Sequence, residues 1–198
     1  SGRGWTTKYA VAGMNPLGLP ELVDGMNEKG LMGGVLNLPN SAQYQAVSAA
    51  ESGNSINSVQ VLTYALSNFA TVDEIKAGLQ QIKVNGAKLA IYGNATPLVH
   101  YTFHDANSKS IVVEYVKGQL TILDNPTTVM TNDPPFEYHL RDIGNYVNLS
   151  NVEKPPLKIN GVTFSAPSSG TGLHGMPGDF LSTSRFIRAL FLSNSVPT

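Results

Sequence analysis

The sequence contains no cysteine in 198 residues. That absence excludes disulfides, thiolate metal sites and a cysteine nucleophile within this chain. It suits the cytosol and the periplasm alike, so cysteine usage leaves the compartment open. Charged residues are also scarce, at 14%, and the formal net charge of −1 is not gathered into runs of like charge. A nucleic-acid-binding protein would normally carry a basic stripe, so we expect no nucleic-acid partner.

Long hydrophobic runs are missing as well. No apolar stretch approaches the roughly 20 residues that a membrane-spanning helix needs, so we expect no membrane partner. What is present is a globular composition, in which 41% of the residues are hydrophobic. A chain of this size can bury a core of its own, and residues 1–198 are predicted to form a single domain.

Hydrophobic periodicity divides the chain into strands and helices. The strand-like runs are residues 8–13, 30–38, 97–104, 110–116, 119–123 and 129–131. The helical stretches are residues 56–69, 72–82, 136–146 and 184–191. Residues 24–30 are predicted to be a turn, and residues 155–179 a loop rich in Pro, Gly and Ser.

Two local signals are sharper than the rest. Thr71 and Glu74 stand at capping-box spacing before an apolar stripe, which predicts a helix start. Lys117-Gly118 separates two strand-like runs and predicts a compact antiparallel hairpin. We expect the first two helices to pack on one face of a sheet. Strands, helices and hairpins follow one another without βαβ alternation, so an α+β layered fold is predicted.

Two sequence patterns lack the structural context that a cofactor or metal site would need. Residues 170–175 match G-x-G-x-x-G, but no convincing strand precedes them and Pro177 follows, so we interpret them as a glycine-rich loop. His100 and His104 would share one face of a strand, yet a third ligand at sensible spacing is lacking. A hydrogen-bonded or surface histidine pair is therefore favoured over a metal site. We expect neither a cofactor nor a metal.

The nucleophile is harder to place. No G-x-S-x-G elbow occurs, so a conventional α/β-hydrolase triad has no anchor. Ser1 could act as an N-terminal nucleophile whose own α-amine is the base. However, Ser1-Gly2 is interpreted equally well as native sequence or as a cloning remnant.

Three polar residues in apolar surroundings are candidate site residues. Asn132 ends an apolar run just before Asp133-Pro134-Pro135, where it could satisfy the turn backbone or present an amide donor to a substrate carbonyl. Asn37 lies between Leu36 and Leu38 and needs either backbone partners or a site to face. The charge of Arg188, in the last helix, must reach solvent or find an anion.

A series of phrases, in one order, resembles the choloylglycine hydrolase family of bile salt hydrolases and penicillin V acylases. The phrases are DGMNEKGL (24–31), VLNLP (35–39), FATVDE (69–74), SIVVEY (110–115), DNP (124–126), MTNDPPF (130–136), GLHGMPGD (172–179) and SRFIR (184–188). The resemblance spans nearly the whole chain. It implies an N-terminal-nucleophile (Ntn) hydrolase fold, an αββα sandwich that is incomplete in this chain.

The resemblance also implies an activity and the residues that serve it. Members cleave the amide bond of conjugated bile salts or of penicillin V with an N-terminal cysteine, and a nearby amide stabilises the oxyanion. By position, Asn132 and Arg188 match active-site residues of the family. Asn37 falls where bile salt hydrolases carry an asparagine, which favours bile salts as substrates. We therefore take Asn37, Asn132 and Arg188 as the candidate catalytic residues.

Parts of the family pattern have no counterpart in this sequence. The first strands, which bear the cysteine, and the stretch after the last helix are not found. We therefore expect the chain alone to be inactive, as a portion of an amidase whose partner is a small-molecule amide substrate. The alternative is a noncatalytic protein that binds amphipathic acyl ligands in the same pocket. For the full-length protein we expect a homo-oligomer, with a cytoplasmic location favoured.

Overall fold

The computed structural model describes residues 2–16 and 18–196, and it consists of two compact units, Ser1–Glu137 and Tyr138–Thr198. The prediction that residues 1–198 form one domain stays a prediction. Within the described residues, no helix has both the length and the apolar character that crossing a membrane requires.

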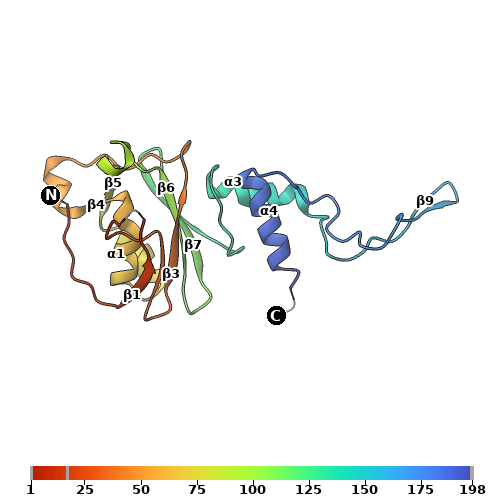
Figure 1. Cartoon of the computed structure of the whole chain (residues 1–198), viewed down its shortest axis with the longest axis horizontal. Helices are drawn as coiled ribbons and strands as arrows, with labels where there is room; N and C mark the ends of the chain where they lie inside the picture. The colour runs from red at the N-terminus through yellow and green to blue at the C-terminus, as the bar shows by residue number, and fades with distance from the viewer. Residues whose placement is uncertain (1, 17, 197–198) are drawn as a thin grey trace. The chain divides into compact units, whose positions relative to one another are not determined.

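The first unit is built on a six-stranded antiparallel sheet (Figure 1). Its strands, in spatial order, are β1 (Val11–Met14), β2 (Asp24–Asn27), β3 (Met32–Asn37), β6 (Val99–His104), β7 (Ser110–Val116) and β8 (Gln119–Asp124). Two short strands, β4 (Ser55–Asn57) and β5 (Lys83–Asn85), pair in parallel beside it.

The β7–β8 hairpin confirms the prediction made from its turn. Lys117 and Gly118 both have positive φ angles, +54° and +74°, as the two central residues of a type I′ turn require. The strand pairing runs from Ile111 opposite Asp124 to Val116 opposite Gln119. All of β7 except Val116 is buried, which explains its nearly continuous apolar sequence.

Two helices, α1 (Val61–Asn68) and α2 (Val72–Leu79), cover one face of this sheet. The capping prediction for α2 is confirmed, because the Thr71 hydroxyl accepts a hydrogen bond from the N–H of Glu74. A second acceptor was not foreseen: the Asp105 carboxylate, from the β6–β7 loop, accepts from the N–H of Val72 at 2.9 Å. The start of α2 is thus fastened to the sheet.

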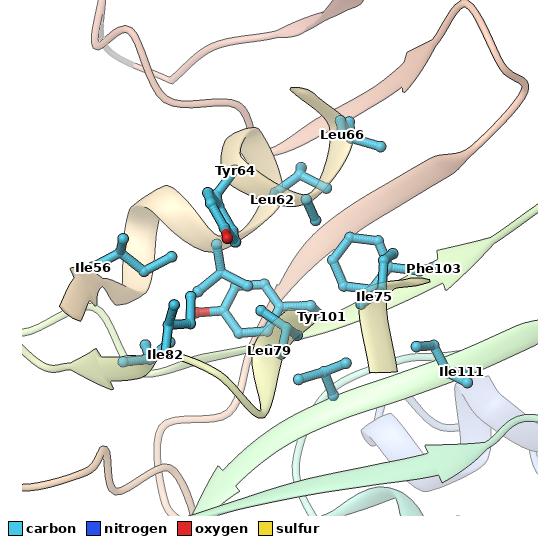
Figure 2. Close-up of a cluster of buried hydrophobic side chains, with 14 of the residues drawn as sticks. Ile56, Leu62, Tyr64, Leu66, Ile75, Leu79, Ile82, Tyr101, Phe103 and Ile111 are labelled. Carbon is cyan, nitrogen blue, oxygen red and sulfur yellow. The ribbon is translucent and has the colours of Figure 1, made fainter. Parts of the chain in front are cut away.

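The core lies between these helices and the sheet (Figure 2). Fully buried side chains from the helices meet those of the strands: Leu62, Leu66, Ile75, Leu79, Tyr101, Phe103 and Ile111. Gly33 on β3 makes the close packing possible. A Cβ atom there would lie 2.7 Å from Phe103 and 2.8 Å from Leu62, so any side chain would force Phe103 or Leu62 to shift.

The predicted turn at residues 24–30 and the predicted start of the helix 56–69 were wrong. Asp24–Asn27 is strand β2 and not a turn, because Asp24, Gly25 and Met26 pair with residues of β1 and β3. The predicted helix 56–69 begins only at Val61. Ile56 instead pairs with Val84 in the β4–β5 ladder, a long-range contact that local periodicity does not reveal.

The predicted strand 129–131 was also wrong. Its carbonyl groups are used by side chains and not by a neighbouring strand: the Val129 carbonyl accepts from Asn125 and the Thr131 carbonyl from His100. With these two carbonyl groups bonded to side chains, residues 129–131 join no strand of the structure.

The second unit contains mainly helix and loop. The C-terminal part of α3 (Phe136–Asp142) continues into η4 (Ile143–Tyr146), and α4 (Ser182–Ser193) matches the predicted last helix. His139 of α3 stacks on Phe186 of α4 with ring centroids 4.8 Å apart. The predicted loop 155–179 contains an unforeseen hairpin, β9 (Leu157–Ile159) and β10 (Val162–Phe164). The remaining short helices are η1 (Ala49–Asn54), η2 (Ser58–Gln60) and η3 (Ala90–Tyr92).

Candidate functional site

Two of the three candidate site residues lie together. The side-chain amide of Asn132 donates a hydrogen bond to the backbone carbonyl of Asn37 at 3.0 Å. Asn37 is the last residue of β3, whereas Asn132 lies in the irregular segment before α3. The amide of Asn132 therefore bonds to a segment that is distant in the sequence.

A second set of bonds ties the same two segments together. The carboxylate of Asp133 accepts from the hydroxyl of Ser41 at 2.5 Å and from the N–H of Asn40 at 2.7 Å. Residues 37–41 and 131–133 are therefore joined by one amide and one carboxylate. Such cross-bonding fixes the backbone on which Asn132 stands.

His100 supports the segment from within the sheet. Its ring is fully buried, with Nδ1 2.9 Å from Oε1 of Glu114 and Nε2 3.1 Å from the carbonyl oxygen of Thr131. Sequence reasoning judged His100 only as a possible partner of His104 and missed Glu114. A carboxylate in the middle of the apolar strand β7 was the signal that could have found this pair.

His104 has a different environment. Its Nε2 lies 3.1 Å from the hydroxyl of Thr102, and burial lowers the pKa of this imidazole. Among the residues that the structure describes, no three or more His, Asp or Glu side chains gather in a way that could hold a metal ion.

Asn37 also borders a cavity of about 350 Å³ in the first unit. The lining residues are Pro16, Leu19, Glu21, Leu22, Val23, Val35, Asn37, Val59, Tyr92, Pro97 and Val99. Most of these side chains are apolar, and Glu21, Asn37 and Tyr92 add polar groups. This composition is typical of a small-molecule site that holds an apolar group and orients a polar one. Its residues come from distant parts of the sequence, so the cavity was not predicted.

Arg188 lies in the second unit, on α4. Its guanidinium donates to the backbone carbonyls of Pro177 and Asp179 at 2.8 Å and 2.6 Å. Hydrogen bonds from the N–H of Leu181 and the hydroxyl of Ser184 lower the pKa of the Asp179 carboxyl, and the charge of Arg188 contributes to the shift. Arg188 thus organises the loop before α4, and its active-site role stays a prediction.

The G-x-G-x-x-G match and Ser1 are not part of the candidate site. Residues 170–175 form turns with positive φ at Gly170 and Gly175, and no helix begins at their end, in agreement with the interpretation as a loop. Ser1, considered as a nucleophile, lies outside the described residues.

Comparison with known proteins defines the class first. Residues 1–198 match the family model of linear amide C-N hydrolases. Within this class, the chain belongs to the choloylglycine hydrolase family.

Among curated relatives, the chain is 38% identical over 193 residues to a bile salt hydrolase/transferase of Clostridium perfringens, which covers 96% of this chain and 58% of the relative. It is 33% identical over 142 residues to a penicillin V acylase of Pectobacterium atrosepticum, with coverage of 69% and 38%. The chain therefore spans little more than half the length of the first of these relatives.

Solved structures confirm the fold. The crystal structure of a conjugated bile acid hydrolase variant from Clostridium perfringens matches with a TM-score of 0.84 and 36% identity, over 96% of this chain and 58% of that chain. A penicillin V acylase from Agrobacterium tumefaciens matches with a TM-score of 0.74 and 26% identity, over 98% and 51%. The chain thus has the α+β fold of these Ntn hydrolases, over part of their length.

Proposed function

We propose that the protein is an amidase that hydrolyses the amide bond of conjugated bile salts, or of penicillin V, through an N-terminal cysteine that lies outside these 198 residues. The observation that carries the proposal is the fixed amide of Asn132, in a chain of the linear amide C-N hydrolase class. The names of the relatives supply the two substrate classes.

The proposed chemistry assigns a task to each part. The cysteine thiolate attacks the amide carbonyl carbon, and the carbonyl oxygen takes up the negative charge. The amide of Asn132 stabilises this oxyanion. When it collapses and the carbon–nitrogen bond breaks, the leaving nitrogen takes the proton that the α-amine of the cysteine had removed from the thiol, and departs as the amine. Water hydrolyses the resulting thioester and releases the acid. Arg188 is proposed to contact the substrate.

The cavity beside Asn37 is proposed to receive the apolar acyl part of the substrate. Its volume of about 350 Å³ falls within the range of roughly 300–1,000 Å³ for ligand pockets. An apolar lining favours a steroid or phenoxyacetyl group, and Asn37 at its border would face the amide end. Asn37 favours the bile-salt class for this site.

The test is an amine-release assay with a glycine-conjugated bile salt and penicillin V, on this chain and on the full-length protein. We expect turnover by the full-length protein, faster on the bile salt, and no turnover by the 198-residue chain. Turnover by this chain would contradict the assignment of the nucleophile to a segment outside it.

A noncatalytic binding protein is the second candidate, because the apolar cavity beside Asn37 could hold an amphipathic acyl ligand without any reaction. Binding of a conjugated bile salt without turnover by the full-length protein would support this alternative. A cysteine at the mature N-terminus together with turnover would exclude it.

We also propose a homo-oligomer for the full-length protein. The β9–β10 hairpin exposes Leu157, Ile159, Val162 and Phe164, each more than half accessible. Apolar side chains in such a group are typical of a surface that another subunit covers. Light scattering on the full-length protein should give a mass above that of one chain, and a monomer at micromolar concentration would contradict the proposal.

A further inference from the structure

The buried side chains of His100 and Glu114 bond to each other and to two backbone groups. The carbonyl oxygen of Thr131 can only accept, so Nε2 of His100 carries a hydrogen. Oε1 of Glu114 accepts from the N–H of Phe136 at 3.0 Å and also faces Nδ1 of His100 at 2.9 Å. One proton between Nδ1 and Oε1 completes the third contact.

These bonds hold both ends of one short segment. His100 binds the carbonyl of Thr131, and Glu114 binds the N–H of Phe136. Between the two anchors lie Asn132 and Asp133, whose side chains bond to residues 37–41. The segment is therefore fixed from two sides, by the interior of the sheet and by the end of β3.

Stability alone does not account for two buried ionisable side chains at this place. Burying such groups costs free energy, and apolar residues of similar volume are often equally stable or better. Val112, on the same face of β7 as Glu114, and Phe136 are fully buried, so an apolar pair would fit this interior. Unlike apolar residues, His100 and Glu114 form directional hydrogen bonds to two backbone groups, the Thr131 carbonyl and the Phe136 N–H.

We propose that His100 and Glu114 are positioning residues for Asn132. The buried pair fixes the backbone of residues 131–136 and so determines where the Asn132 amide points. This inference rests on the proposed function, in which that amide stabilises an oxyanion. A misplacement of a catalytic group by about 1 Å can cost roughly a hundredfold in rate. Loss of the bonds that position the Asn132 amide should therefore lower the rate of the reaction.

Two isosteric variants separate the bonds of His100. The amide nitrogen of His100→Gln stands close to the position of Nε2 and can still donate to the Thr131 carbonyl. The shorter His100→Asn places its amide near Nδ1 and loses Thr131. His104→Gln, on the same strand, is the matched control because His104 does not contact the segment 131–136 in any hydrogen bond described above.

The kinetic arm uses the full-length protein and measures amine release. We expect His100→Asn to lower kcat by about tenfold or more, with a much smaller change in KM. His100→Gln should recover most of this loss, and His104→Gln should retain full activity. Equal losses in the Asn and Gln variants, in step with their thermal unfolding temperatures, would overturn the proposal.

The structural arm uses the 198-residue chain and needs no activity. In crystal structures we expect the bond from Asn132 to the Asn37 carbonyl to be broken or to have two conformers in His100→Asn, and to be retained in His100→Gln. An unchanged bond in His100→Asn overturns the positioning role. If the unmodified full-length protein cleaves neither substrate, the proposed function fails. The crystal structures still test whether His100 and Glu114 position the Asn132 amide.

Discussion

The side-chain amide of Asn132 donates to the backbone carbonyl of Asn37 at 3.0 Å, although the two residues are 95 positions apart. The bond uses the side chain of one asparagine and only the backbone of the other. Asn37 also borders the cavity. Substitutions at the two positions should therefore have different kinetic consequences.

Replacement of Asn132 by Ala should remove the oxyanion donor. We expect kcat of the full-length protein to fall by about 10²–10³ with little change in KM, as for other single oxyanion-hole donors. Steady-state amine release on a conjugated bile salt measures both constants. A raised KM with an unchanged kcat would instead assign Asn132 to ground-state binding.

Replacement of Asn37 by Ala leaves its backbone carbonyl in place. The Asn132 amide should keep its partner, so we expect the loss to appear in KM, by about fivefold to tenfold, equivalent to one hydrogen bond of about 1 kcal/mol. Kinetics on the same substrate decide this. A fall in kcat as large as that of Asn132→Ala would show that both asparagines act on the oxyanion.

Filling the cavity should block the acyl group. Val59 lines the cavity from η2, and in Val59→Trp we expect conjugated bile salt to bind this chain at least about tenfold more weakly, since steric overlap removes apolar contacts. Titration calorimetry measures this affinity without turnover. The control is Val162→Trp on the exposed hairpin, which should bind as the unmodified chain does. Equal affinity in all three would place the ligand elsewhere.

Local signals explain what the sequence could predict. The Thr71 cap and the Lys117-Gly118 turn each act within a few residues, and both predictions were confirmed. The three candidate site residues came from the family resemblance together with their polar character. Among these three residues, the structure shows a hydrogen bond from Asn132 to the backbone of Asn37.

What escaped prediction depends on distant residues. Ile56 is a strand residue because Val84 pairs with it. The sequence near position 56 carries no signal for this pairing. The cavity forms from residues far apart in sequence, and the role of Glu114 requires His100 on the neighbouring strand. The β9–β10 hairpin is a different case. Its Asn160-Gly161 turn, with both φ angles positive, is a local signal that was overlooked within a loop-like composition.

The Asp105 carboxylate gives the stability of the chain a pH dependence. Burial raises the pKa of Asp105, but hydrogen bonds from the N–H groups of Val72, Lys109 and Asn107 lower it by more, so the net pKa is below its ordinary value of 3.8. A lowered pKa in the folded state means that the stabilisation is complete above the ordinary value. It is lost as the pH falls through the lowered value.

The variant Asp105→Asn tests this dependence. Its amide would face the Val72 N–H with a donor, so we expect a loss of about 1–3 kcal/mol at neutral pH that shrinks as the pH falls below 4. Urea unfolding at several pH values measures it. Asp73→Asn is the control, because the exposed Asp73–Lys109 ion pair should be worth less than about 1 kcal/mol. A pH-independent loss would contradict the assignment to the carboxylate.

Two buried tyrosines provide a matched pair for the energetics of the core. The hydroxyl of Tyr101 donates to the backbone carbonyl of Ser58 at 2.6 Å, whereas the buried hydroxyl of Tyr115 has no hydrogen-bond partner among the described residues. Their rings contact each other edge-on with centroids 6.5 Å apart, so the two sites share one environment. Burial raises the pKa of both hydroxyls, and both are uncharged in the folded protein at neutral pH.

Replacement by Phe removes only the hydroxyl from each. Tyr101→Phe breaks a buried hydrogen bond and should cost about 1 kcal/mol, because the Ser58 carbonyl retains the N–H of Val61 as a partner. Tyr115→Phe removes a buried polar group that has no partner, so its free energy of unfolding should be unchanged or higher. Urea unfolding of both variants side by side measures the difference. A loss in Tyr115→Phe as large as that in Tyr101→Phe would mean that the Tyr115 hydroxyl has a partner in solution, most simply an ordered water molecule.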